Sequence, residues 1–128
     1  MMPSESNVKI LKIEIIKFID ISEKRDKNIL EILPLAKEHL KHHFKSGNNK
    51  NLNAIHRCFK QICEKPNSME QLNWYERYKE HNEIETVRIN LKDRFSFIRR
   101  NGYIFVMSLL EHPKDYNYFK TKLTNKFL

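Results

Sequence analysis

The sequence is poor in glycine and proline, which build tight turns, in cysteine, which forms disulfides, and in tryptophan. It has 2 glycines, 4 prolines, 2 cysteines and 1 tryptophan in 128 residues. It contains no Gly-rich phosphate loop, no Ser-centred nucleophile elbow and no zincin motif. Cys58 and Cys63 fall on different faces of one predicted helix, so they do not match a zinc spacing and are expected to be reduced, half-buried thiols. These absences argue against the common metal-dependent and phosphate-loop enzymes, and we expect no cofactor and no metal.

Long apolar runs are missing as well. No segment approaches the roughly 18 uncharged apolar residues that a membrane span needs, and residues 1–6 do not resemble a signal peptide. We therefore expect a cytoplasmic protein without a membrane partner. The length predicts a single domain over residues 1–128, which buries about two thirds of its unfolded surface, with residues 1–7 disordered.

Positive charge is in excess. The chain has 24 Lys+Arg against 16 Asp+Glu, a net charge of +8. Such a surplus indicates a polyanionic partner or an acidic protein surface. Because the charge is spread over the whole chain, it does not by itself locate a binding site.

The clearest structural signal is a hairpin centred on Asn101-Gly102, the preferred pair for a two-residue type I′ turn. It joins strands predicted at Arg94–Arg99 and Tyr103–Leu110, and the second strand is apolar enough to be central in a sheet. Counting outward from the turn predicts the pairs Ile98 with Phe105, Phe97 with Val106, Ser96 with Met107 and Arg94 with Leu109.

The remaining elements are predicted from periodicity. An isoleucine-rich segment, Val8–Ile21, alternates like a strand. A helical stripe runs from Asp26 to Phe44, where Pro34 must kink or divide the helix, and Gly47 ends it. A second helix covers Asn51–Glu64.

Two shorter segments and a last helix complete the order. Ser68 and Gln71 form a capping-box pattern that opens a short helix through Tyr78, or else a structured loop. Residues 83–90 form the first strand of a three-stranded meander, and a helical period returns after Pro113. The order predicts an α+β fold: an N-terminal strand, two or three helices, a three-stranded antiparallel meander and a C-terminal helix, with the helices on one face of the sheet.

The sequence of the last third of the chain resembles the RelE/ParE superfamily of bacterial type II toxins. The resemblance rests on short motifs between residues 84 and 120, whereas the upstream helices match by topology alone. These motifs are Val87-Arg88-Ile89-Asn90, Asp93-Arg94-Phe95-Ser96-Phe97, Gly102 to Ser108 and His112-Pro113-Lys114-Asp115-Tyr116. Asp93 departs from the pattern, since an aromatic residue is common there.

The resemblance implies a RelE-like fold and an mRNA interferase, an endoribonuclease that cuts mRNA without a metal, in some members at the ribosome. It also implies a cognate antitoxin protein as a partner. That partner would cover the basic face or pack on the second face of the sheet, which Ile98, Phe105 and Met107 make apolar.

Cleavage through the 2′-hydroxyl needs a proton acceptor, positive charge on the phosphate and a proton donor for the leaving 5′ oxygen. His112 matches the family's strand-end histidine and Arg94 its strand arginine, and Tyr116 or Tyr118 supplies the site aromatic. Each also has a plain structural reading, as a surface histidine, a solvated strand face or a core aromatic. The basic residues expected to hold RNA are Arg88, Lys92, Arg99, Arg100 and Lys114.

One geometric obstacle is visible in the sequence. By simple strand alternation Arg94 shares a face with Met107 and Leu109, whereas His112 falls in parity with Ser108 and Leu110. A bulge, or the bend at Pro113, must intervene for the two to converge.

Two alternative functions remain open. One is a non-enzymatic binder on the same fold, like the gyrase-directed members, and another is a small basic nucleic-acid-binding accessory protein. A metal site at His39, His42 and His43 lacks a carboxylate or cysteine to complete it. The aromatic cluster of Trp74, Tyr75 and Tyr78 either stacks on RNA bases or packs in the core.

Overall fold

A five-stranded sheet organises the molecule in the computed structural model, which describes residues 5–24, 30–78, 83–100 and 102–110. The strand order is β1-β5-β4-β3-β2. β1 runs parallel to β5, and the other neighbours are antiparallel. The strands are β1 (Leu30–Ile32), β2 (Tyr75–Arg77), β3 (Glu85–Arg88), β4 (Arg94–Arg100) and β5 (Tyr103–Ser108). The predicted meander is therefore β3-β4-β5, and β5 lies inside the sheet as expected.

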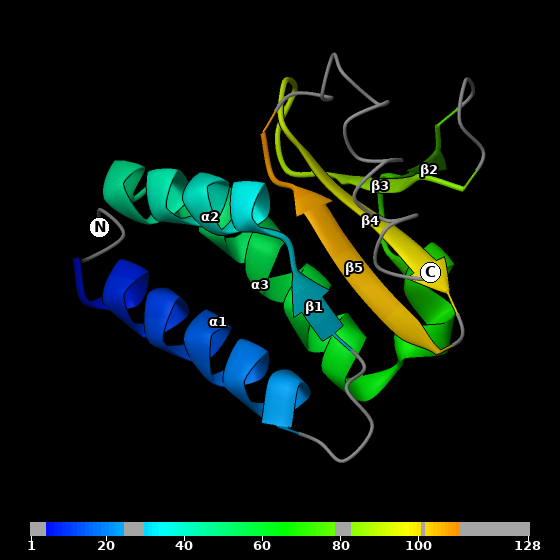
Figure 1. The fold of residues 1–128 in the computed structure, drawn as a ribbon. Coiled ribbons are helices and arrows are strands. Elements are labelled where there is room, and N and C mark those ends of the chain that lie inside the picture. The colour runs from blue at the N-terminus through cyan, green and yellow to red at the C-terminus, as the bar shows by residue number, and fades with distance from the viewer. Residues whose placement is uncertain (1–4, 25–29, 79–82, 101, 111–128) are drawn as a thin grey trace.

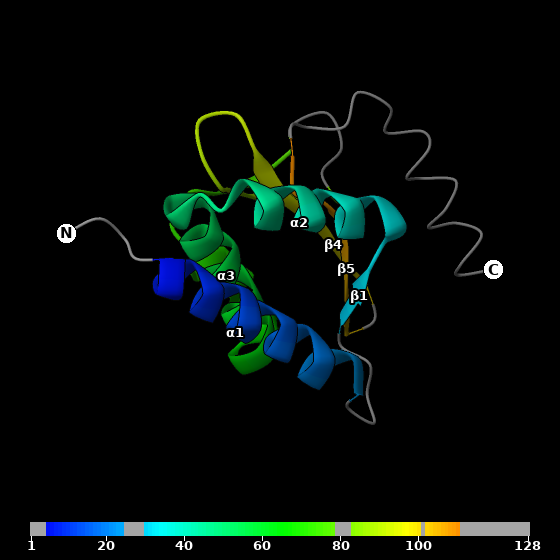
Figure 2. The ribbon, with the colours of Figure 1, turned by 90° about the vertical axis from the view of Figure 1, so that its left-hand side faces the viewer.

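Three α-helices and a 3-10 segment complete the described chain: α1 (Glu5–Lys24), α2 (Pro34–Ser46), α3 (Asn49–Glu64) and η1 (Pro66–Gln71). Figure 1 shows α1 and α3 running alongside each other, with α2 above them. Figure 2, which views β4 and β5 nearly edge-on, places α1 and α3 together on one side of these strands. The predicted α+β class is confirmed, with α1 and α3 on one face.

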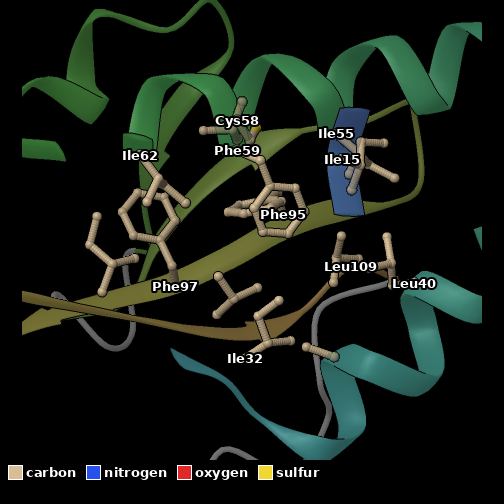
Figure 3. Close-up of a cluster of buried hydrophobic side chains, with 14 of the residues drawn as sticks. Ile15, Ile32, Leu40, Ile55, Cys58, Phe59, Ile62, Phe95, Phe97 and Leu109 are labelled. Carbon is tan, nitrogen blue, oxygen red and sulfur yellow. The ribbon is translucent and has the colours of Figure 1, made fainter. Parts of the chain in front are cut away.

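The main core lies between α3 and that face of the sheet. α3 begins at the N-cap Asn48, whose side chain accepts a hydrogen bond from the Asn51 backbone amide (3.0 Å). Its apolar stripe then packs against the inward side chains of β4, and the rings of Phe59 and Phe95 meet edge to face at 5.2 Å. Figure 3 shows this layer, which burial of apolar surface stabilises.

The segment predicted as a first strand, Val8–Ile21, is instead helical. The apolar residues that seemed to alternate belong to two stripes on opposite sides of one helix. The inner stripe packs on the core and the outer stripe leaves Ile10, Ile13, Ile16 and Ile21 about half exposed. Isoleucines on an exposed helix face imitated the period of a strand. α1 also includes residues 5–7, the last three of the segment that we expected to lack structure.

The helix predicted from Asp26 starts only at Pro34. Proline favours the first helical position and drives the preceding residue away from helical angles. Leu33 accordingly has φ −66° and ψ 154°, and Leu30 to Ile32 pair with β5 as a strand. Gly47 ends α2 at φ 66°, with its amide bonded to the His43 carbonyl, as predicted.

The segment after α3 is neither a capped helix nor a plain loop. Ser68 makes no capping hydrogen bond, and η1 is interrupted at that residue (φ −126°). Tyr75 to Arg77 then form β2, an edge strand on β3. Local pattern missed this strand because its stability comes from pairing with a distant segment.

The second face of the sheet carries a smaller core. Ile98, Phe105 and Met107 are at most 2 % exposed there and cluster with Leu33 and Ile84. We had expected these three side chains to offer an apolar surface to a partner. Their burial within the chain means that they are not open for one.

Candidate functional site

Two arginines lie side by side on the face of the sheet turned away from α1 and α3. Arg88 of β3 is the register partner of Arg94 in β4. Side chains alternate between faces along a strand, and the neighbours Val87 and Phe95 point into the main core, so both arginines point the other way. In the part of the chain that the structure describes, neither arginine forms an ion pair with a carboxylate.

Both arginine side chains are half-buried. Burial first, and then the like charge of Arg88, lowers the pKa of Arg94. Two partly desolvated cations at neighbouring positions repel each other, and an anion placed between them relieves that repulsion. The pair is therefore a suitable receptor for a phosphate.

Arg94 is held in place by the loop between β3 and β4. Its Nη1 donates to the backbone carbonyls of Asn90 and Asp93, both at 3.1 Å. The Asn90 side chain shapes that loop, since its Oδ1 accepts from the amides of Lys92 and Asp93 and its Nδ2 donates to Asp93 and to Asn51 of α3. Asp93, which departs from the family pattern, thus supports the loop that fixes Arg94.

A carboxylate that the sequence interpretation missed faces the same cluster. Glu76 of β2 pairs in register with Thr86, which pairs in turn with Ser96. Paired residues on neighbouring strands face the same side of a sheet, and so do residues two apart on one strand. Arg88 is two residues from Thr86 and Arg94 is two residues from Ser96, so Glu76 lies on the face that carries both arginines. Glu76 is exposed, and its negative charge acts to raise the pKa of Arg94. An exposed carboxylate beside two cations is placed as a proton acceptor would need to be if those cations held a phosphate.

The strand pairing contains the irregularity that the sequence required. Ile98 pairs with Phe105 and Phe97 with Val106, as predicted, but Ser96 pairs with Ser108 rather than with Met107. Met107 is thus an extra, bulged residue, and the Arg94 amide donates to the Leu110 carbonyl (3.2 Å). The predicted pairs Ser96–Met107 and Arg94–Leu109 are wrong by one residue. The shift places Arg94 on the same face as Ser108 and Leu110.

The bulge leaves two polar groups in an unusual state. The hydroxyls of Ser96 and Ser108 are fully buried and, among the described residues, have no hydrogen-bond partner. Unpaired buried hydroxyls cost free energy. They lie opposite each other on the face that carries Arg94, so the local structure here is not optimised for stability alone.

The other predicted site residues fall into three groups. Lys92 is exposed in the loop beside Arg94. His112, Lys114, Tyr116 and Tyr118 lie outside the described residues, and their predicted roles remain predictions.

Arg99 lies on the opposite face of β4 from Arg94. Its Nε donates to Glu85 (2.9 Å) and its Nη2 to Glu70 (2.6 Å), while Tyr75 donates to the same buried Glu85 carboxylate. These hydrogen bonds raise the pKa of Arg99. Arg100 pairs with Glu83 at the far end of the strand. The carboxylate partners reduce the charge that both residues can offer to a phosphate.

The aromatic cluster of Trp74, Tyr75 and Tyr78 was expected either to pack in the core or to stack on RNA bases, and its members differ. Tyr75 is half-buried and bonded to Glu85, and Tyr78 packs against the smaller core. Trp74 is 69 % exposed and has a left-handed backbone at φ 66°. The Arg88 guanidinium carbon lies 5.5 Å from the centre of its ring. Core packing accounts for the tyrosines but not for Trp74.

The helical histidines hold the backbone rather than a metal. His43 Nε2 donates to the Leu109 carbonyl (2.5 Å), and the Leu109 amide donates to His39 Nδ1 (3.1 Å). Within the described ranges no group of three or more potential ligands could hold a metal ion. None of the helices there is long and apolar enough to cross a membrane.

The cysteines are buried and unpaired with each other. Cys63 Sγ donates to the Phe18 carbonyl (3.4 Å). Burial raises the pKa of Cys58 to about 12. Both therefore act as core residues, more deeply buried than the sequence indicated.

Comparison with known proteins gives a likeness of structure only. The sequence matches no protein-family model and no curated protein. Two solved structures from Staphylococcus aureus resemble the chain: the YoeB-YefM complex (TM-score 0.53, 22 % identity) and the YoeB dimer (TM-score 0.52, 20 % identity). Each match covers 66 % of this chain and 95 % of the YoeB chain. The chain shares the fold of YoeB, and the predicted RelE-like fold is confirmed.

Proposed function

We propose that this protein is the toxin of a type II toxin-antitoxin system and an endoribonuclease that cleaves mRNA without a metal. The observation that carries the proposal is the grouping of Arg88, Arg94 and Glu76 on one face of a RelE-like fold. The net charge of +8 supports a polyanionic substrate.

The proposed reaction divides among these groups. Glu76 takes the proton of the 2′-hydroxyl, whose oxygen attacks the neighbouring phosphorus in line with the leaving 5′ oxygen. Arg94 donates to the non-bridging oxygens as these gain charge, and Arg88 beside it holds a neighbouring phosphate. The P–O5′ bond breaks, and His112, the histidine predicted from sequence, gives the leaving oxygen its proton. The products are a 2′,3′-cyclic phosphate and a 5′-hydroxyl.

A cognate antitoxin belongs to this proposal. YoeB is known in a complex with YefM, and we infer that an equivalent protein binds here. Because Ile98, Phe105 and Met107 are buried, the antitoxin would cover the basic face around Arg88 and Arg94. Acidic side chains on the antitoxin would complement that face.

The test uses the purified protein and a defined mRNA in two arms. Free RNA is incubated in EDTA, and translating ribosomes are used without EDTA because they need magnesium. The cut ends are mapped for wild type, Glu76→Gln and His112→Ala, with Glu64→Gln, an exposed carboxylate on α3, as the control. We expect cyclic-phosphate ends in at least one arm, lost in the two site variants and kept in the control. A folded protein that cuts in neither arm contradicts the enzyme and favours a non-enzymatic binder on this fold.

A further inference from the structure

A pocket of about 200 Å³ lies beside the arginine pair, between α3 and the turn that enters β2. Arg57 of α3 and Arg88 of β3 line it, together with the amide side chains of Gln71 and Asn73 and the ring of Trp74. Val87 contributes an apolar wall. None of the residues that line the pocket is a carboxylate, so its charge is positive.

Trp74 is an unexpected residue for its position. The Tyr75 amide bonds to the Leu72 carbonyl (3.3 Å), which makes residues 72–75 a turn with Trp74 as its third residue. The φ of 66° there suits glycine or asparagine, and a bulky aromatic is an outlier. The ring is also 69 % exposed, so it buries little surface in return. Folding stability does not explain a tryptophan here, whereas a role in binding does.

Arg88 connects the pocket to the candidate active site. Its guanidinium lies 5.5 Å from the centre of the Trp74 ring, within the range of a cation–π contact that helps to hold the ring in place. The same residue is the register partner of Arg94. Arg88 is therefore the residue that the pocket and the arginine pair have in common.

We propose that this pocket takes one unpaired base of single-stranded RNA, stacked on Trp74, with the adjoining phosphate held by Arg57 and Arg88. The base belongs to a nucleotide next to the one cleaved, so the inference rests on the proposed function. Exposed aromatic rings stack on bases of any kind, and flanking cations hold the backbone. The amides of Gln71 and Asn73 can both donate to and accept from a base edge, which gives the pocket a means of preferring particular bases.

The sequence supplies a direct probe, because Trp74 is its single tryptophan. Short single-stranded RNA with 2′-O-methyl groups throughout cannot undergo the proposed attack and therefore stays intact. The protein is titrated with this RNA while tryptophan fluorescence is recorded, and the affinity is measured separately from the anisotropy of a labelled strand. We expect saturable quenching at the same RNA concentration that saturates the anisotropy.

Variants separate binding from folding. Trp74→Gly removes the ring and suits the left-handed backbone, so we expect its melting temperature to be unchanged or higher while its affinity for the RNA falls about tenfold or more. Arg57→Gln is expected to weaken binding in the same assay. Tyr103→Ala, at another exposed ring, and Lys60→Gln, at an exposed cation on α3, are the matched controls and should bind like wild type.

Wild-type binding without a change in tryptophan emission, or a Trp74→Gly protein that binds as tightly as wild type, overturns the pocket. Both results are independent of cleavage, because the RNA cannot be cut. Quenching by a protein that cuts no mRNA would leave the pocket standing and count against the nuclease alone.

Discussion

Arg94 and Arg99 are five positions apart on β4, an odd number, so they face opposite sides of the sheet. Arg99 is bound to Glu85, whose side chain is 4 % exposed. Removing Arg99 leaves this buried carboxylate with the Tyr75 hydroxyl and, as its cation among the described residues, only the more distant and exposed Arg77 (4.0 Å). We expect Arg99→Met to lower the free energy of unfolding by about 2 kcal/mol or more. Urea unfolding at neutral pH measures this.

Arg100→Met is the comparison for that experiment. Arg100 and Glu83 are about a third exposed, and such pairs contribute at most about 1 kcal/mol. Equal losses in the two variants would show that the Arg99 network is no more important to the fold than a surface ion pair.

Glu76 and Arg94 carry the chemical prediction. Glu76→Gln keeps the size of the side chain but cannot accept the hydroxyl proton, and we expect kcat to fall about 100-fold or more. Arg94→Lys keeps the charge but loses the planar fork, and a fall of similar size is expected. Single-turnover cleavage measures both, and the melting temperature checks the fold. Retained activity in Glu76→Gln would remove that residue from the mechanism.

The sequence predicted the arginines of the candidate site, but not the carboxylates that lie beside them or bind them. Arg88 and Arg94 were recognised because they lie within the motifs of one meander. Glu76 was missed because β2 has no local signal, and its place beside β3 depends on pairing between distant segments. The carboxylate partners of Arg99 were hidden for the same reason, since Glu70 and Glu85 come from η1 and β3.

At the scale of elements, α2 is fastened to the end of β5 by two histidines. The Leu109 amide donates to His39 Nδ1, which only an unprotonated nitrogen can accept. Burial first, and then the charge of His43, lowers the pKa of His39 below its ordinary 6.5, although Asp93 opposes this. The unfolded chain thus binds the proton more tightly than the folded one.

The pH dependence follows from that difference. The contribution of neutral His39 is present above pH 6.5 and is lost as the pH falls below it. We expect wild type to lose more unfolding free energy than His39→Gln between pH 7.5 and 5, because glutamine can accept the same hydrogen bond without titrating. Urea unfolding across this range measures it. Parallel losses in the two proteins would show that His39 does not set the acid sensitivity.

Elements that depend on local chemistry were predicted well. Counting outward from Asn101-Gly102 along the chain correctly predicted the pairs Ile98–Phe105 and Phe97–Val106. Gly47 predicted the end of α2, and the apolar stripe predicted the extent of α3 to within two residues. The failures at α1, β1 and β2 come from segments whose secondary structure is decided by the elements they pack against or pair with. Leu30 to Ile32 are extended because β5 offers a hydrogen-bonding edge there, which the local pattern does not reveal.

At the scale of the whole molecule, the excess of positive charge predicts salt-sensitive binding. For single-stranded RNA, the slope of log affinity against log salt is about −0.7 per neutralised phosphate. We expect Arg57→Gln and Arg88→Gln each to make the slope shallower by about 0.7, and Lys60→Gln to leave it unchanged. Anisotropy titrations at several salt concentrations measure it. An equal change in the salt slope of all three variants would mean that binding depends on the overall net charge rather than on the cations of the pocket.

The pairing of β1 with β5 determines when the sheet can be completed. A parallel contact between strands so far apart in sequence closes late, whereas helices and the hairpin need only nearby residues. Because a chain leaves the ribosome from its N-terminus, β1 and the histidines of α2 are made before their hydrogen-bonding partners. They stay unpaired until Val106 and Leu109 emerge. The sheet therefore stays incomplete until β5 has been synthesised.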